Sequence, residues 1–217
     1  MRVLLVAATE FEVGGLKSEV RSRKSEADSE LKTHDLELLI TGVGMVATAF
    51  ALGRHLALNQ YDLAINLGIA GSFDRNIALG ELVEVVEDNL SELGAEDAEA
   101  FLTIESMGFG ESIFKPTAGL SAYGNFNLKQ VTAVTVNTVH GHEPSIIKLT
   151  GRMQPQLESM EGAAFFYACK QAGVPCLQIR AVSNYVEKRN RDAWQIGLAI
   201  KNLNSFAVEL LKMLQTL

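Results

Sequence analysis

The sequence has few cysteines and few clustered basic residues. Its 217 residues include only Cys169 and Cys176, and a chain of this length needs no disulfide framework, so reduced thiols and a cytoplasmic location are expected. The formal net charge of -7 argues against nucleic acid or an anionic membrane as a partner, because both favour clustered Lys and Arg. The Arg-Ser-Arg-Lys run at residues 21–24 is surrounded by acidic residues and is expected to be a solvated turn.

Long hydrophobic runs and metal-ligand clusters are also missing. The apolar opening, residues 3–8, is far shorter than the roughly 18 residues of a membrane span and lacks the features of a signal peptide. His140 and His142 have no acid or cysteine at ligand spacing, so they are interpreted as polar loop histidines. Neither a metal nor a cofactor is expected.

Short apolar runs bounded by Gly, Asp or Asn alternate with longer segments of helical spacing. The runs predict buried strands at residues 3–8, 36–40, 63–67, 82–86, 133–136 and 176–182, with a short strand after Pro155. The longer segments predict helices at 45–59, 162–171 and 192–217, and Gly173 followed by Pro175 is a helix stop. We expect one α/β domain over residues 1–217, a three-layer αβα sandwich around a mixed, mostly parallel sheet.

Residues 89–128 show no clear periodicity. They mix acids, glycines and isolated aromatics and are interpreted as an excursion from the sheet. This excursion is either a lid or subunit contact, or a solvated connection with a few packed aromatics.

Polar residues follow three of the predicted strands. Glu12 lies just after the first strand, at the edge where open α/β sheets bind ligands, and is a candidate base; a helix-start acid is the alternative. Residues 66–72 are small and suited to a flat base, or form a tight turn. Asn184 follows the last strand, and its amide carries both a donor and an acceptor, although an Asx turn would use the same residue.

Glu161 interrupts the transition from a short strand into the apolar segment 163–168. A carboxylate there is costly unless it binds something. The two vicinal hydroxyls of a ribose suit it, because a carboxylate accepts two hydrogen bonds at once. A helix N-cap or first-turn acid is the alternative.

Gly42 and Gly44 follow a strand and open a helix, which matches a dinucleotide fingerprint, and Asp62 lies near the spacing of its ribose-binding acid. However, Asp62 precedes its strand and would lie at the opposite edge of the sheet. A nicotinamide-dependent dehydrogenase would rest on these two glycines alone. We expect them to let helix and strand pack closely, or backbone approach a ligand.

Taken together, the motifs at residues 8–13, 41–44, 66–71, 160–161 and 180–184 resemble, in order and spacing, the purine nucleoside phosphorylase and nucleosidase superfamily. Within it, residues 182–187 (Val-Ser-Asn-Tyr-Val-Glu) and 190–194 (Asn-Arg-Asp-Ala-Trp) are most similar to the futalosine hydrolases of menaquinone biosynthesis. The resemblance covers nearly the whole chain. It implies a three-layer fold, a purine nucleoside as substrate and a homo-oligomer.

The resemblance also implies roles for individual residues. Glu12 would activate water and Asn184 would stabilise the departing purine. The implied substrate-binding residues are Thr9, Ala70, Gly71, Thr138, Ser159, Met160 and Glu161. Ile69 stands where relatives that cleave methylthioadenosine have a serine, and Met45 where they have a lysine, so the polar surroundings of the attacking water are not implied.

Two features indicate the reaction and the base. The phosphorylases hold phosphate after the first strand, where this chain has Glu10 and Glu12, and carboxylates repel phosphate; hydrolysis is therefore expected. Asn184 replaces an aspartate of the adenine-specific relatives, and its amide donates to the O6 of a 6-oxopurine such as the hypoxanthine of futalosine. Alternatives are a nucleosidase or phosphorylase for inosine, methylthioadenosine or another purine nucleoside, and a purine-binding protein without turnover.

Overall fold

The computed structural model describes residues 1–16 and 36–214, so the solvated turn expected at 21–24 lies outside the described residues. The strands are β1 (Val3–Ala7), β2 (Leu36–Ile40), β3 (Leu63–Ser72), β4 (Leu82–Leu90), β5 (Gly94–Asp97), β6 (Ala100–Thr103), β7 (Ile113–Phe114), β8 (Lys129–Thr135), β9 (Leu157–Ser159) and β10 (Cys176–Tyr185). The helices are α2 (Met45–Leu56), α3 (Glu143–Arg152), α4 (Gly162–Ala172) and α5 (Ile196–Leu214), with 3-10 turns η1 (Leu120–Ala122) and η2 (Arg191–Ala193).

The strands form a mixed, mostly parallel sheet, as expected. Parallel pairing joins β2 to β1, β1 to β3 and β3 to β10, whereas β10 is antiparallel to β4. From β4 the order continues through β8 and β9, and β9 returns to pair with β3.

This return corrects the expected plain sandwich, because β3, β10, β4, β8 and β9 close into a five-strand barrel. The register shifts by one residue between Val85 and Glu87 in β4 and between Val182 and Asn184 in β10. Such bulges bend a strand and increase its twist. Strands β3, β4 and β10 are also nine or ten residues long, longer than predicted and long enough to curve around the ring.

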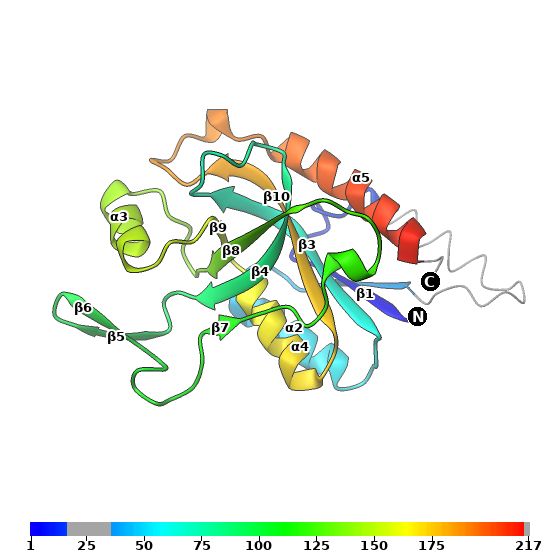
Figure 1. Cartoon of the computed structure of the whole chain (residues 1–217), viewed down its shortest axis with the longest axis horizontal. Helices are drawn as coiled ribbons and strands as arrows, with labels where there is room; N and C mark the ends of the chain where they lie inside the picture. The colour runs from blue at the N-terminus through cyan, green and yellow to red at the C-terminus, as the bar shows by residue number, and fades with distance from the viewer. Residues whose placement is uncertain (17–35, 215–217) are drawn as a thin grey trace, which may run out of the picture.

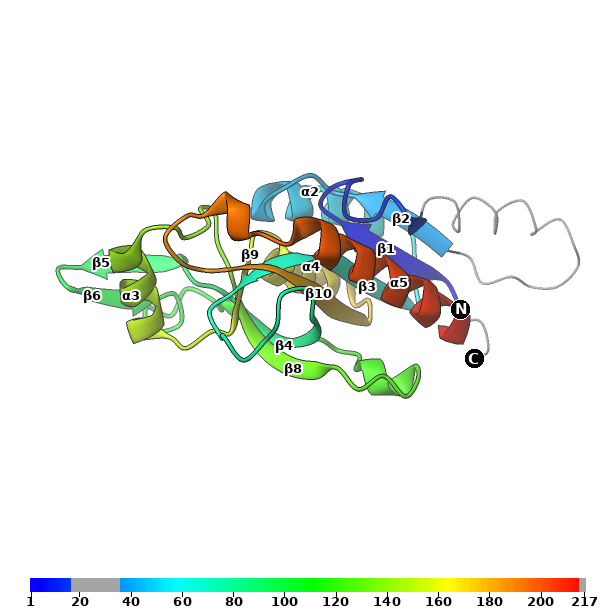
Figure 2. The ribbon, with the colours of Figure 1, turned by 90° about the horizontal axis from the view of Figure 1, so that it is seen from above.

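Helices cover the sheet on both faces. Helix α5 packs along β10 and β3 on one face, and α2 and α4 pack together on the other; Figure 2 shows the same arrangement from above. The side chains of β1 alternate between two cores, with Leu5 on the α5 side and Leu4 on the other. This double burial explains why the strands read as continuous apolar runs. No helix within the described ranges is long and apolar enough to cross a membrane.

Most element predictions are confirmed, and one helix was missed. Gly173 adopts φ 67° and ends α4, as the sequence predicted. Helix α3 was not predicted because it is short and polar on average, and only Leu149 of its ten residues is buried. The segment 89–128 partly leaves the sheet: Figure 1 shows β5 and β6 as a projecting hairpin, while β7 returns to pair with β4 and buries Phe114. Its role as a lid or subunit contact stays a prediction.

Candidate active site

A pocket of about 370 Å³ opens where β1, β3 and β10 end. These strands are parallel, so their carboxyl ends meet at one edge of the sheet, where α/β folds bind ligands. The volume lies in the range of small-molecule sites. Eight of the nine predicted site residues line it, namely Thr9, Glu12, Ala70, Gly71, Ser159, Met160, Glu161 and Asn184. Thr138 is exposed and is not part of the lining.

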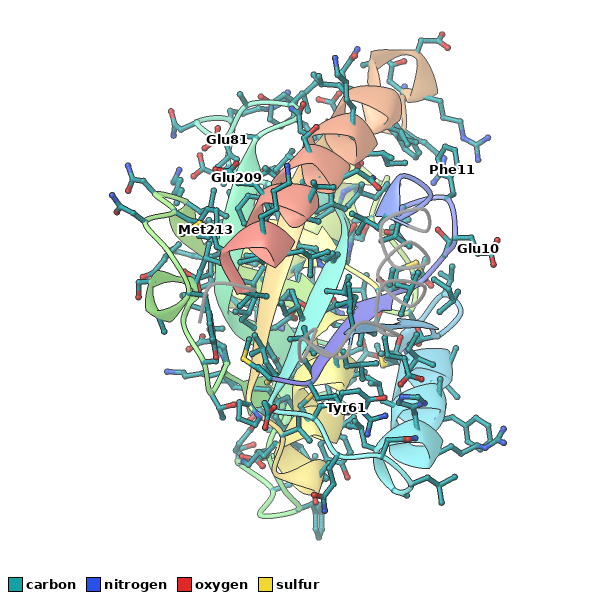
Figure 3. All side chains as sticks on the ribbon, turned by 90° about the vertical axis from the view of Figure 1, so that its right-hand side faces the viewer. Glu10, Phe11, Tyr61, Glu81, Glu209 and Met213 are labelled. Atoms are coloured by element: carbon teal, nitrogen blue, oxygen red, sulfur yellow. The ribbon has the colours of Figure 1, made fainter. Side chains whose placement is uncertain are left out.

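Glu12 is buried in the turn that follows β1. Its Oε2 accepts hydrogen bonds from the backbone N–H (3.0 Å) and the hydroxyl (3.1 Å) of Thr9, and its Oε1 accepts one from the backbone N–H of Ile69 (3.2 Å). It therefore belongs to a turn rather than a helix start, with its carboxylate fixed at the pocket wall. Glu10 is exposed instead, and Figure 3 shows it with Phe11 on the same turn, pointing outward. Only one of the two predicted carboxylates thus faces the pocket.

Arg180 lies beneath Glu12 in the barrel and is 2% exposed. Its Nη2 donates to the side-chain oxygens of Asn66 and Gln178. A Cβ on Gly68 would collide with the Arg180 guanidinium and would lie 3.1 Å from Glu12 Oε1. The lack of a side chain at Gly68 therefore lets the guanidinium and the carboxylate both lie against this residue. Arg180 was not among the predicted site residues, because nothing in the sequence shows which way its side chain faces.

The same interior holds a second buried carboxylate. Asp88 accepts hydrogen bonds from the Thr135 hydroxyl (2.8 Å) and the Gln178 amide (2.9 Å). Complete burial raises the pKa of Asp88 to about 6, against the lowering effect of these bonds and of Arg180. A line of polar groups therefore runs through the barrel interior.

Glu161 stands at the N-cap position of α4, but its side chain makes no capping bond. Its Oε1 accepts a hydrogen bond from the backbone N–H of Gly44 (3.0 Å), in the turn before α2. Gly44 has φ 96°, a conformation that glycine adopts without strain. The dinucleotide-like motif thus contributes a backbone donor to the Glu161 carboxylate. Asp62 instead accepts a hydrogen bond from the backbone N–H of Arg2, before the start of β1 and away from this edge of the sheet.

Ala70 and Gly71 lie within β3, which continues to Ser72, so the tight turn that was the alternative for residues 66–72 is not formed. Asn184 pairs with Gly71 through the bulge of β10. The Asn184 side chain accepts from the Ser183 hydroxyl (2.8 Å) and donates to the Tyr185 carbonyl (3.1 Å). An amide nitrogen has two hydrogens, so a second donor remains for a ligand.

The pocket also contains residues that were not among the predicted site residues. They include Phe11, Val43, His140, Glu158, Arg189 and Trp194. His140 lies in a loop, as predicted, but its ring is largely buried against Glu158, which the sequence did not indicate. Among the described residues, no three His, Cys, Asp or Glu side chains are grouped as a metal site would require.

The fold and this pocket define an α/β protein with a small-molecule site at the carboxyl edge of its sheet. The phosphorylase superfamily model matches residues 2–217, and the chain belongs to that superfamily.

Two futalosine hydrolases are similar in sequence. That of Streptomyces coelicolor is 34% identical over 188 residues, covering 83% of this chain and 80% of the relative. That of Thermus thermophilus is 32% identical over 179 residues, covering 80% of each. The resemblance stated from the motifs is confirmed.

Solved structures share the fold. The futalosine hydrolase of Helicobacter pylori strain 26695 superposes with a TM-score of 0.79 at 12% identity, over 98% of this chain and 97% of that one. The 5'-methylthioadenosine/S-adenosylhomocysteine nucleosidase of Colwellia psychrerythraea 34H, in complex with adenine, gives 0.78 at 22% identity, over 99% and 96%.

Proposed function

We propose that this chain hydrolyses the N-glycosidic bond of futalosine, releasing hypoxanthine and dehypoxanthine futalosine. The observation that carries the proposal is the meeting of two buried carboxylates, Glu12 and Glu161, with the amide of Asn184 in one pocket. The similarity to futalosine hydrolases indicates which purine nucleoside enters it.

In the proposed reaction, Glu161 accepts hydrogen bonds from the ribose hydroxyls and Met160 packs against the sugar. Glu12 takes a proton from water as the water oxygen bonds to the anomeric carbon. The bond from that carbon to the purine nitrogen breaks, and its electron pair leaves with the base, which gains a proton. Asn184 donates to O6 or N7 of the departing purine and so stabilises the developing charge.

Water rather than phosphate is the proposed nucleophile. A phosphate entering beside Glu12 would meet a carboxylate that is already held by the Thr9 and Ile69 backbone N–H groups. These donors satisfy the carboxylate, so they are not available to bind an anion.

Arg189 is the proposed partner of the benzoate carboxylate that futalosine carries. It lines the pocket and lies 5.1 Å from the centre of the Trp194 ring. Arg152 instead donates to the Ser91 carbonyl in a neighbouring hollow. Arg191 is not part of the pocket lining.

A homo-oligomer in the cytoplasm is also proposed. Phe11, Val43, Val46 and Phe50 form an exposed apolar surface beside the pocket, with Phe11 71% and Val46 78% exposed, and two of its members line the pocket. A second copy of the chain would cover this surface. Light scattering checks the mass, and Phe50→Asp is expected to dissociate the assembly; a monomeric wild-type protein would contradict this part of the proposal.

The central experiment incubates the protein with futalosine, aminofutalosine, inosine and methylthioadenosine, with and without phosphate, and follows the released base by chromatography. We expect fastest release from futalosine and no phosphate requirement. A strict need for phosphate would refute hydrolysis. Fastest release from methylthioadenosine or inosine would move the assignment to another nucleosidase, and binding of hypoxanthine without release would indicate a purine-binding protein.

A further inference from the structure

His140 and Glu158 form a pair in the wall of the pocket. The Glu158 carboxylate contacts His140 twice, at Nδ1 of the ring and at the backbone N–H (2.9 Å). The side chains are only 3% exposed for Glu158 and 14% for His140. Both residues line the pocket, yet neither has a part in the mechanism above.

The contact with Glu158 determines what the ring offers a ligand. Burial raises the pKa of Glu158, while its bonds to His140 lower it. A carboxylate only accepts hydrogen bonds, so a neutral His140 ring would carry its proton on Nδ1, facing Glu158. The other nitrogen, Nε2, then carries a lone pair, and it has no hydrogen bond to any residue in the described part of the chain.

The sheet places Glu158 on the other side of Gly71 from Asn184. Gly71 of β3 pairs with Asn184 on one side and with Glu158 of β9 on the other. Neighbouring strands lie about 4.8 Å apart, so a flat base over Gly71 would have Asn184 at one edge and the His140–Glu158 pair at the other. The absence of a side chain at Gly71 keeps this space open. A Cβ added there would collide with Val186 and would lie 3.2 Å from Asn184 Nδ2.

We propose that His140 is a second base-reading residue, whose Nε2 accepts a hydrogen bond from N1–H of a 6-oxopurine while Glu158 positions the ring. This inference rests on the proposed function. Adenine has a lone pair at N1 in place of the N1–H, so it offers no donor to Nε2 there. Asn184 then recognises O6 from the N7 side of the base, and His140 recognises N1–H from the N1 side.

The test measures binding of hypoxanthine, 1-methylhypoxanthine and adenine by calorimetry, because methylation removes N1–H and leaves O6 in place. We expect the wild-type protein to bind hypoxanthine at least about tenfold more tightly than the methylated base. His140→Asn keeps an amide near Glu158 and removes the distal nitrogen. This variant is therefore expected to bind hypoxanthine and 1-methylhypoxanthine about equally tightly. His140→Gln carries an acceptor further out and is expected to restore most of the preference.

His142→Asn is the matched control, because this exposed histidine lies in the same loop and outside the pocket lining; the preference is expected to stay at the wild-type value. An unchanged preference in His140→Asn overturns the inference, as does equal weakening of all three bases, which would make the pair structural. If the wild-type protein releases base from futalosine but ignores N1 methylation, the inference alone fails. If it binds and cleaves no purine compound, the proposed function fails with it.

Discussion

Replacing Gly162, the first residue of α4, by alanine is expected to destabilise the protein, which is the opposite of the usual effect of this substitution in a helix. Replacing a helical glycine by alanine ordinarily stabilises a protein by up to about 1 kcal/mol. At Gly162, however, a Cβ would lie well inside 3.0 Å of Asp88 Oδ2 and of the Gln178 side-chain amide. Both neighbours are completely buried, so neither can move into solvent.

The magnitude follows from the bonds that the methyl group would break. Asp88 is held by Gln178 at 2.9 Å and by Thr135 at 2.8 Å. Each buried polar group left without its partner costs roughly 1 to 3 kcal/mol. Loss of both bonds, less the gain in helix propensity, gives a net destabilisation of about 3 kcal/mol, or roughly 6 to 12 °C in Tm for a chain of this size.

Gly53→Ala in α2 is the matched control, because this glycine is exposed and its Cβ would meet nothing within 4 Å. Urea unfolding followed by circular dichroism is expected to show Gly53→Ala slightly more stable than wild type and Gly162→Ala clearly less stable. If Gly162→Ala is as stable as wild type or more so, the buried Asp88–Gln178 pair is not the constraint described here.

Four further predictions concern the site and its charges. Asn184→Asp is expected to raise kcat/KM for aminofutalosine relative to futalosine, and an unchanged ratio would show that the base is read elsewhere. Glu12→Gln is expected to lower kcat by about 10²- to 10⁴-fold with hypoxanthine binding retained; wild-type turnover would remove Glu12 as the base. Arg189→Ala is expected to raise KM for futalosine but not for inosine, and a parallel rise would argue against a carboxylate contact. Burial raises the pKa of Asp88 to about 6, so the folded protein holds this proton more tightly than the unfolded chain, and its stability falls as pH rises from about 4 to 6. Urea titrations at pH 4 and 7 are expected to show that Asp88→Asn removes about 3 kcal/mol of that fall. A pH profile identical to that of the wild type would contradict this prediction.

The sequence predicted the strands and the edge of the sheet better than the shape of the sheet. Buried strands between two helical layers are apolar on both faces, which makes them visible as runs such as residues 63–67 and 176–182. Closure into a barrel depends instead on bulges at Val86 and Ser183, and a single extra residue has no apolar signature. Helix α3 was missed for a related reason, because it buries almost nothing.

The candidate site was predictable where a polar residue ends a strand. Glu12, Glu161 and Asn184 are conspicuous for that reason, and the structure brings them together. His140 and Arg180 were not, since their contributions depend on partners 18 and 114 residues away, Glu158 and Asn66. Thr138 was placed in the site by resemblance alone and lies outside the pocket lining.

The bulge in β10 selects which side chain faces Gly71. Val182 pairs with Ala70 and Asn184 with Gly71, so Ser183 is passed over and its hydroxyl turns to the Ala70 carbonyl (3.1 Å). In an unbulged strand Ser183 would stand opposite Gly71, because strand partners advance one by one. A change in base preference could therefore evolve by insertion or deletion of one residue before position 184, with no substitution among the pocket residues themselves.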